Sequence, residues 1–322
     1  MEWPAMTEIN AMTVHDGTPV LVHVGMPKTG TTTLQELFFA RHPDIHYLGQ
    51  TNLWDVAAAK QVLRGLLLDD APETALAGGL VAEGLMAKPA VVISDEALTF
   101  GEYMLRAPQW SIRSDHEKTA RRIRAALGQV HVLIVVRNQS DWMVSWHRQG
   151  LKTGKYVETG FQKWLEKDLG ETAEHMMELL RYDKMYKAFA DVFGIDYVHV
   201  RFFEECVGDF PGLAVEVANL LGVAPDVARQ LVSEQARNVT GKRFVGLSPA
   251  VQRFVRQGWV KGFLKKIPKQ LRGGLRGFLV SNRIYEEMSE ADRAAVRAQF
   301  AESNQRFFSI LGKEQNPSLG YF

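Results

Sequence analysis

The sequence predicts an α/β fold in which a central parallel sheet is covered by helices on both faces. Two observations support this prediction. Short runs of β-branched and other apolar residues are typical of buried strands, and longer segments between them have helical periodicity. Strands that alternate with helices favour a parallel sheet, because each helix carries the chain back to the same edge. The predicted strands are residues 19–25, 45–48, 89–94, 131–136 and 197–202.

The predicted helices lie between and after these strands. The segment 171–193 has the length of one long helix that ends at Gly194. The other helices are expected at 34–40, 54–87 with a break at Gly78 and Gly79, 115–127, 141–150 and 211–221. We expect residues 1–18 to form a loose extension and 19–322 a single domain, with helical insertions at about 50–88 and 240–288.

Composition and charge narrow the class of protein. The 322 residues are 46% apolar and 23% charged, which is ordinary for a globular chain and argues against wholesale disorder. A net charge of +1 predicts no strong overall attraction to nucleic acids. The single cysteine, Cys206, cannot form an intrachain disulfide, and the N-terminus does not read as a signal peptide. No apolar run approaches the ~20 residues that span a bilayer, so we expect a cytoplasmic protein.

Positive charge is concentrated in one segment. Residues 235–285 contain twelve Lys or Arg and no Asp or Glu, so the rest of the chain carries 26 basic against 37 acidic residues. Within this segment, residues 253–266 mix cations with aromatic side chains. This stretch could form a lid for an anionic glycan, rest on a membrane surface, or be a solvated helical face with an apolar stripe. Nucleic-acid binding is not expected, because no nucleic-acid-binding motif accompanies the charge.

A loop rich in Gly, Pro and Thr joins the first predicted strand to the first helix. In residues 25–33, backbone N–H groups at the start of the helix can surround a phosphate, and the helix dipole favours its negative charge. The separation of Gly25 and Gly30 resembles that of a Walker A sequence. However, Thr31 stands where that motif has its lysine, and the only lysine of the loop is Lys28.

The departure at Lys28 points to a particular family. Residues 27–33 resemble the 5′-phosphosulfate loop of sulfotransferases that use 3′-phosphoadenosine 5′-phosphosulfate (PAPS), and they lean towards the bacterial and carbohydrate-type members. The resemblance implies a P-loop NTPase-like three-layer sandwich with no metal requirement, in which Lys28 contacts the bridging oxygen between phosphate and sulfate. The loop residues implied to bind PAPS are Lys28, Thr29, Gly30, Thr31, Thr32 and Thr33. Thr33 occupies a position where many cytosolic members carry Trp.

A second anion site is predicted after the strand 131–136. Arg137 lies at the carboxyl end of that strand, where open α/β sheets place ligands, and Ser145 lies on the following helix. A guanidinium and a hydroxyl suit a phosphate. The pair resembles the family's 3′-phosphate motif. By further resemblance, Phe203 could lie near the adenine, and Arg237 and Asn238 match a late segment that returns to the cofactor.

A general base is expected directly after the strand 89–94. Family members that act on sugars often place a catalytic Glu there, and Glu96 fits that position best. Asp95 is the close competitor, and capping of a following helix by these residues is the structural alternative. His116 and His147 are expected to be surface or supporting side chains rather than bases.

These motifs predict in-line transfer of a sulfuryl group from PAPS to an acceptor hydroxyl or amine, which leaves 3′-phosphoadenosine 5′-phosphate (PAP). The acceptor could be a glycan, a lipid or a small molecule, and the Glu96 resemblance favours a glycan. Two other functions remain open. A nucleotide-dependent kinase could use the acids after residue 94 to hold Mg²⁺, and a non-catalytic anion-binding module could recruit a partner through its basic segment.

Overall fold

A computed structural model describes most of the predicted core. The described residues are 17–49, 88–100, 115–153, 156, 158–170, 172–233, 246–247, 280–281 and 286–322. Several sequence predictions lie wholly or largely outside these residues: the extension 1–18, the insertions at about 50–88 and 240–288, the binding residues Arg237 and Asn238, and the basic stretch 253–266.

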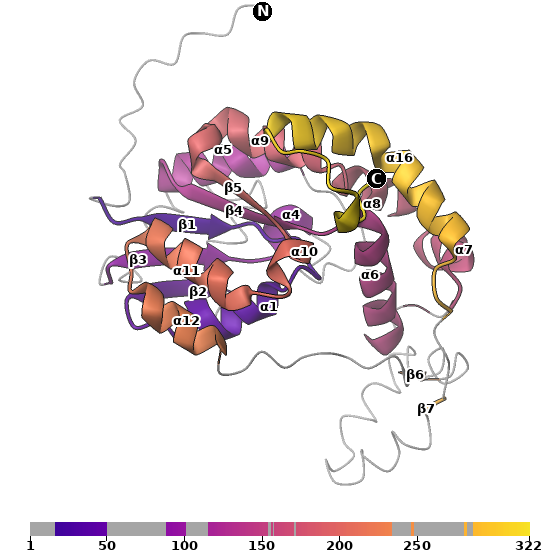
Figure 1. Ribbon diagram of the computed structural model, residues 1–322, viewed down its shortest axis with the longest axis horizontal. Coiled ribbons are helices and arrows are strands. Elements are labelled where there is room, and N and C mark those ends of the chain that lie inside the picture. The colour runs from indigo at the N-terminus through magenta and orange to yellow at the C-terminus, as the bar shows by residue number, and fades with distance from the viewer. Residues whose placement is uncertain are drawn as a thin grey trace, which may run out of the picture.

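Five described strands form a parallel sheet in the order β2-β3-β1-β4-β5, which confirms the predicted fold class (Figure 1). These strands are β1 (Val20–His23), β2 (Ile45–Gly49), β3 (Ala90–Ser94), β4 (His131–Val136) and β5 (Val198–Phe202). A separate antiparallel pair consists of β6 (Gly246–Leu247) and β7 (Val280–Ser281).

The strand order places two carboxyl ends side by side at the centre of the sheet. From β1 the chain builds β2 and β3 on one side, then crosses to build β4 and β5 on the other. Val22 therefore pairs with Val132, and the Val24 N–H donates to the Leu133 carbonyl at 3.1 Å. Ligands of open α/β sheets bind where the order reverses in this way, so the loop after β1 and the residues after β4 share one crevice.

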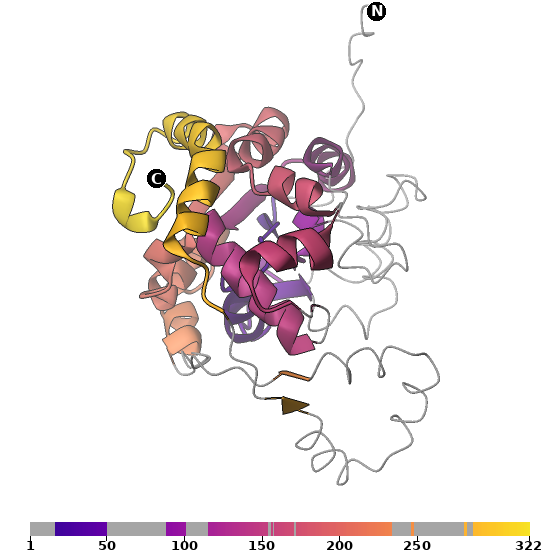
Figure 2. The same ribbon diagram turned by 90° about the vertical axis from the view of Figure 1, so that its right-hand side faces the viewer.

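Helices cover both faces of the sheet (Figures 1 and 2). In β4, the side chains of Val132, Ile134 and Val136 join one apolar core, and those of Leu133 and Val135 join the other. The first core is covered by α5 (His116–Leu127), α6 (Gln139–Thr153), α8 (Thr172–Leu179), α9 (Tyr182–Phe193) and α16 (Glu290–Ile310). The second is covered by the π-helical η1 (Leu34–Phe39), which continues directly from α1 (Thr31–Thr33), and by α11 (Phe210–Leu221) and α12 (Pro225–Ser233). The shorter helical segments are α4 (Ala97–Phe100), α7 (Phe161–Lys163), η4 (Trp164–Leu169), η5 (Ile195–Tyr197), α10 (Phe203–Cys206) and η6 (Pro317–Leu319).

The predicted single helix over 171–193 is wrong. It is divided into α8 and α9, because Leu180 and Arg181 leave the helical path between them. Arg181 has a ψ of 86°, which no helix accommodates. The Leu180 carbonyl accepts a hydrogen bond from the Gln139 side-chain amide at 3.2 Å instead of a helical N–H. A tertiary contact therefore replaces the helical hydrogen bond at the break.

Candidate active site

The loop after β1 is held by hydrogen bonds to three successive carbonyl groups. The Met26 carbonyl accepts from the Thr29 hydroxyl at 2.5 Å, and the Pro27 carbonyl accepts from the Trp142 indole at 2.6 Å. The Lys28 carbonyl accepts from Arg137 Nη1 at 3.2 Å. Because the N–H of a trans peptide points opposite to its carbonyl, the N–H groups of Lys28 and Thr29 face away from Trp142 and Arg137. This orientation lets them line an anion cradle from the other side.

Two positive φ angles give the loop its shape. Lys28 has φ 70° and is the only non-glycine residue in the left-handed region among those described. Gly30 has φ 78° and lies directly before α1. A Cβ at Gly30 would lie 2.2 Å from Cζ of Phe210, so this position disfavours a side chain both by conformation and by space. A non-glycine residue with a strained backbone, such as Lys28 in the loop before α1, is typical of a ligand-binding site.

The three threonines of α1 lie in different surroundings. Thr31 is buried, Thr32 is exposed and Thr33 is half-buried. The Thr31 hydroxyl donates to Glu96 Oε1 at 2.5 Å, so its hydroxyl is committed to that carboxylate. The Thr33 N–H donates to the Gly30 carbonyl at 2.9 Å, so the N–H groups of Thr31 and Thr32 and the other two hydroxyls are the donors that this helix start offers to an anion.

Glu96, the residue expected to be the base, lies beside the loop. It follows β3, and its carboxylate reaches across to Thr31 instead of folding back onto α4. Burial raises the pKa of Glu96, while the Thr31 hydrogen bond and the charge of Lys28 oppose that rise. A carboxylate with a raised pKa is a stronger base than an exposed one. Asp95 adds to the rise through like-charge repulsion.

A buried polar group under the loop was not predicted from the sequence. His23 Nδ1 lies 2.8 Å from Ser94 Oγ, which also accepts from the Gln35 amide at 3.0 Å. Burial lowers the pKa of His23 to about 4, so the ring is neutral at pH 7. A Cβ at Gly25 would lie 2.6 Å from His23 Nε2, which shows how closely the ring supports the loop. A histidine inside an otherwise apolar strand was the signal that could have found it.

Arg137 extends from the carboxyl end of β4 to the same crevice. Its guanidinium lies over the Phe203 ring, with Cζ 4.6 Å from the ring centroid. Burial lowers the pKa of Arg137, and the nearby charges of Asp141 and Glu204 oppose this effect. Within the described part of the chain, the buried Nε has no hydrogen-bond partner. A half-buried guanidinium whose Nε donor lacks a partner is typical of an anion-binding group.

The structure also describes the positions of Ser145, His116 and His147. Ser145 is half-buried on α6, one helical turn beyond Trp142, whose indole contacts the loop. His147 is buried and packs against Trp164, whereas His116 is half-buried and packs against Phe189.

Within the described ranges, no three His, Cys, Asp or Glu side chains gather as they would around a metal ion. None of the described helices combines the length and apolar character needed to cross a membrane.

The chain as a whole is similar to proteins of one family. Residues 18–237 match the model of the sulfotransferase domain. A sulfotransferase from Alicyclobacillus acidocaldarius has the same fold, with a TM-score of 0.57 and 18% sequence identity. The match covers 92% of this chain and 97% of the Alicyclobacillus chain. Mouse sulfotransferase SULT7A1 complexed with PAP matches with a TM-score of 0.35 and 15% sequence identity, and the match covers 81% of this chain and 82% of the mouse chain. A search of curated proteins found no match. The family match spans more than half of the sequence, so the chain belongs to the sulfotransferase domain family.

Proposed function

We propose that this sulfotransferase uses PAPS as its sulfuryl donor and that one nucleotide spans its two anion motifs. The observation that carries the proposal is the hydrogen bond from Arg137 Nη1 to the Lys28 carbonyl, at 3.2 Å. It brings the residue expected at the 3′-phosphate against the loop expected at the 5′-phosphosulfate. The unused Nε donor of Arg137 gives a second phosphate oxygen a partner.

The residues of the loop would act on the leaving group. PAPS supplies a sulfuryl group whose bond to the bridging oxygen breaks as the acceptor oxygen or nitrogen attacks sulfur. Negative charge then grows on the departing phosphate, and the Lys28 ammonium stabilises it together with the N–H groups of α1. Lys28 also interacts with Glu96 through its charge, so the cation and the base belong to one site.

Glu96 would accept the proton of the attacking group. Its raised pKa and its fixed bond to Thr31 suit a base held in one orientation. We propose a glycan hydroxyl as the acceptor, because a carboxylate base in this position resembles that of sugar-directed relatives. Contact of the segment 253–266 with an anionic glycan or a membrane surface is part of this proposal and rests on its charge.

Calorimetry without Mg²⁺ tests the donor. We expect PAP to bind at least about tenfold more tightly than ATP, because only PAP offers a 3′-phosphate to Arg137. Equal affinity for the two nucleotides, or binding that requires Mg²⁺, would favour the kinase alternative. Incubation with radiolabelled PAPS and a panel of glycans in EDTA then tests transfer. PAP binding with no label transferred to any acceptor would favour the non-catalytic module over the enzyme.

A further inference from the structure

The C-terminal residues 316–322, called the tail below, are packed into the protein beside the Arg137 site. Tyr321 is fully buried, although it is the second-last residue of the chain. Its ring meets Phe202 edge-on with centroids 5.4 Å apart, and Phe308 at 5.5 Å. Phe202 is the last residue of β5, so the tail closes the carboxyl edge of the sheet, where the ligand site lies.

The tail contacts the residues that fix the backbone next to Arg137. The Tyr321 hydroxyl lies 3.4 Å from Glu204 Oε2. Through Oε1, Glu204 accepts from the Asn138 backbone N–H at 2.8 Å and from its side-chain amide at 2.9 Å. The Tyr182 hydroxyl donates to the Arg137 carbonyl at 2.6 Å. The peptide on the carboxyl side of Arg137 is therefore held at both its carbonyl and its N–H.

Gly320 touches the same asparagine from the other side. Its φ is 76°, and a Cβ there would lie 3.3 Å from Asn138 Nδ2. That spacing is tighter than an ordinary van der Waals contact, so a side chain at 320 would push on Asn138. Asn138 Nδ2 also donates to Asp141 at 3.1 Å, and Asp141 is held in turn by Arg293 of α16 at 2.8 Å.

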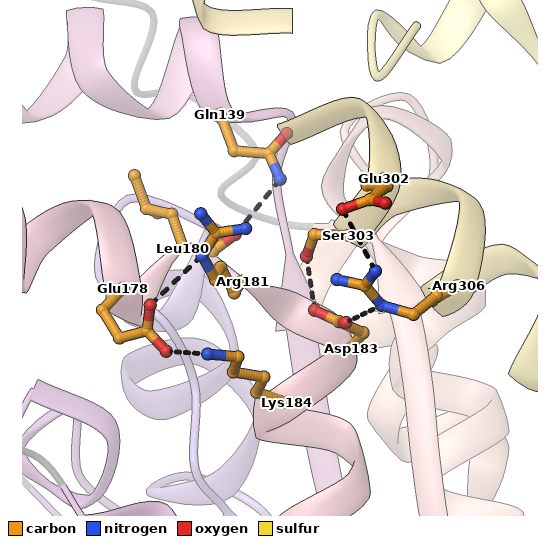
Figure 3. A network of polar contacts seen from close by, with 9 residues as sticks. All are labelled: Gln139, Glu178, Leu180, Arg181, Asp183, Lys184, Glu302, Ser303 and Arg306. Carbon is orange, nitrogen blue, oxygen red and sulfur yellow. Dashed lines mark hydrogen bonds and ion pairs between the residues drawn. The ribbon is translucent and has the colours of Figure 1, made fainter. Parts of the chain in front are cut away.

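Polar contacts that are buried or half-buried hold helix α16 to α9 and to the tail, and Figure 3 shows those with Asp183 of α9. Asp183 of α9 accepts from the Ser303 hydroxyl and, at 2.8 Å, from Arg306 Nε. Asn304 accepts from the Gln139 amide at 2.8 Å and donates to the Tyr321 carbonyl at 2.9 Å. Buried polar groups are costly unless they are all paired, so this network tolerates one arrangement of α16, the tail and the start of α6.

We infer that the tail is a positioning element of the Arg137 clamp: through Gly320 and Tyr321 it holds Asn138 and Glu204, and so sets where the guanidinium meets a 3′-phosphate. The inference rests on the proposed function, and it assigns a role in nucleotide selection to residues that touch no nucleotide themselves. It requires that damage to the tail weaken recognition of the 3′-phosphate much more than binding of the 5′ end of the nucleotide. Of the three hydrogen bonds that hold the loop at Lys28, only one comes from Arg137, and those from Thr29 and Trp142 do not depend on it.

The test compares Gly320→Ala with Gly312→Ala. Both glycines have positive φ, 76° and 61°, so both variants carry similar backbone strain. Only Gly320 faces Asn138, because a Cβ at Gly312 would meet nothing within 4 Å. Calorimetry measures the affinity of each variant for PAP and for adenosine 5′-phosphate, which lacks the 3′-phosphate. Tyr321→Phe provides a second probe, with Phe322→Leu as its control, since Phe322 packs on Phe308 and carries no hydroxyl towards Glu204.

We expect Gly320→Ala to bind PAP about fivefold more weakly than Gly312→Ala, an effect the size of one ordinary hydrogen bond, with equal affinity for adenosine 5′-phosphate. A smaller loss in the same direction is expected for Tyr321→Phe relative to Phe322→Leu. If both probes match their controls on PAP, or weaken both nucleotides equally, the inference is wrong while the proposed function stands. If the wild-type protein itself binds both nucleotides equally, the proposed function fails and the inference fails with it.

Discussion

Replacing Gly30 by alanine tests the conformation of the loop on which the site depends. Gly30 has φ 78°, and an L-residue in the left-handed region costs roughly 1–2 kcal/mol. The added Cβ would lie 2.2 Å from Phe210 Cζ, and relief of such an overlap typically costs about 1–3 kcal/mol. We therefore expect Gly30→Ala to lower the free energy of unfolding by about 2–5 kcal/mol.

A matched control separates the two contributions. Gly222 has φ 65° and nothing within 4 Å of its Cβ position, so Gly222→Ala should show the conformational cost alone, roughly 1–2 kcal/mol. In a Phe210→Ala background the overlap disappears, and Gly30→Ala should then cost no more than Gly222→Ala. Urea denaturation followed by tryptophan fluorescence measures all five proteins. The reasoning is refuted if Gly30→Ala equals Gly222→Ala in the wild-type background, or if the double mutant is additive within about 0.5 kcal/mol.

Two further predictions concern catalysis. Lys28→Gly should lower kcat about 10²–10³-fold, because it removes a donor that stabilises the transition state. The free energy of unfolding should not fall, because glycine accepts φ 70° without strain. Retained turnover in a radiolabelled PAPS assay would contradict the role of Lys28. Burial raises the pKa of Glu96, so this base becomes protonated, and inactive, at a pH above the ordinary carboxyl pKa of ~4.3. The fall of kcat/KM on the acid side of the pH profile, called the acid limb here, should therefore be centred above that value. Glu96→Gln should remove the limb and slow the reaction about 10²–10⁴-fold, whereas an unchanged limb would assign it to another group.

The sheet and the two anion motifs could be predicted because their signals are local. Each strand is a short buried run, and Arg137 follows directly on β4. Glu96 could be narrowed only to a pair with Asp95, because both follow the same strand. What distinguishes the two side chains in the structure is the bond to Glu96 from Thr31, 65 residues away in the sequence.

The features that the sequence did not predict depend on tertiary contacts. Helix α16 buries Ser303 and Asn304 between Phe300 and Phe307, so polar residues interrupt the apolar stripe that would have revealed it. The break at Leu180 requires the Gln139 side chain, and the burial of Tyr321 requires β5 and α16. Each of these contacts joins segments whose proximity exists only after folding.

The affinities of Arg137→Ala for PAP and for adenosine 5′-phosphate test most directly whether a single nucleotide reaches both anion sites. The account predicts that this variant binds PAP no more tightly than adenosine 5′-phosphate, while its affinity for adenosine 5′-phosphate stays within about twofold of the wild-type value. A variant that still prefers PAP as strongly as wild type does would show that Arg137 does not recognise the 3′-phosphate.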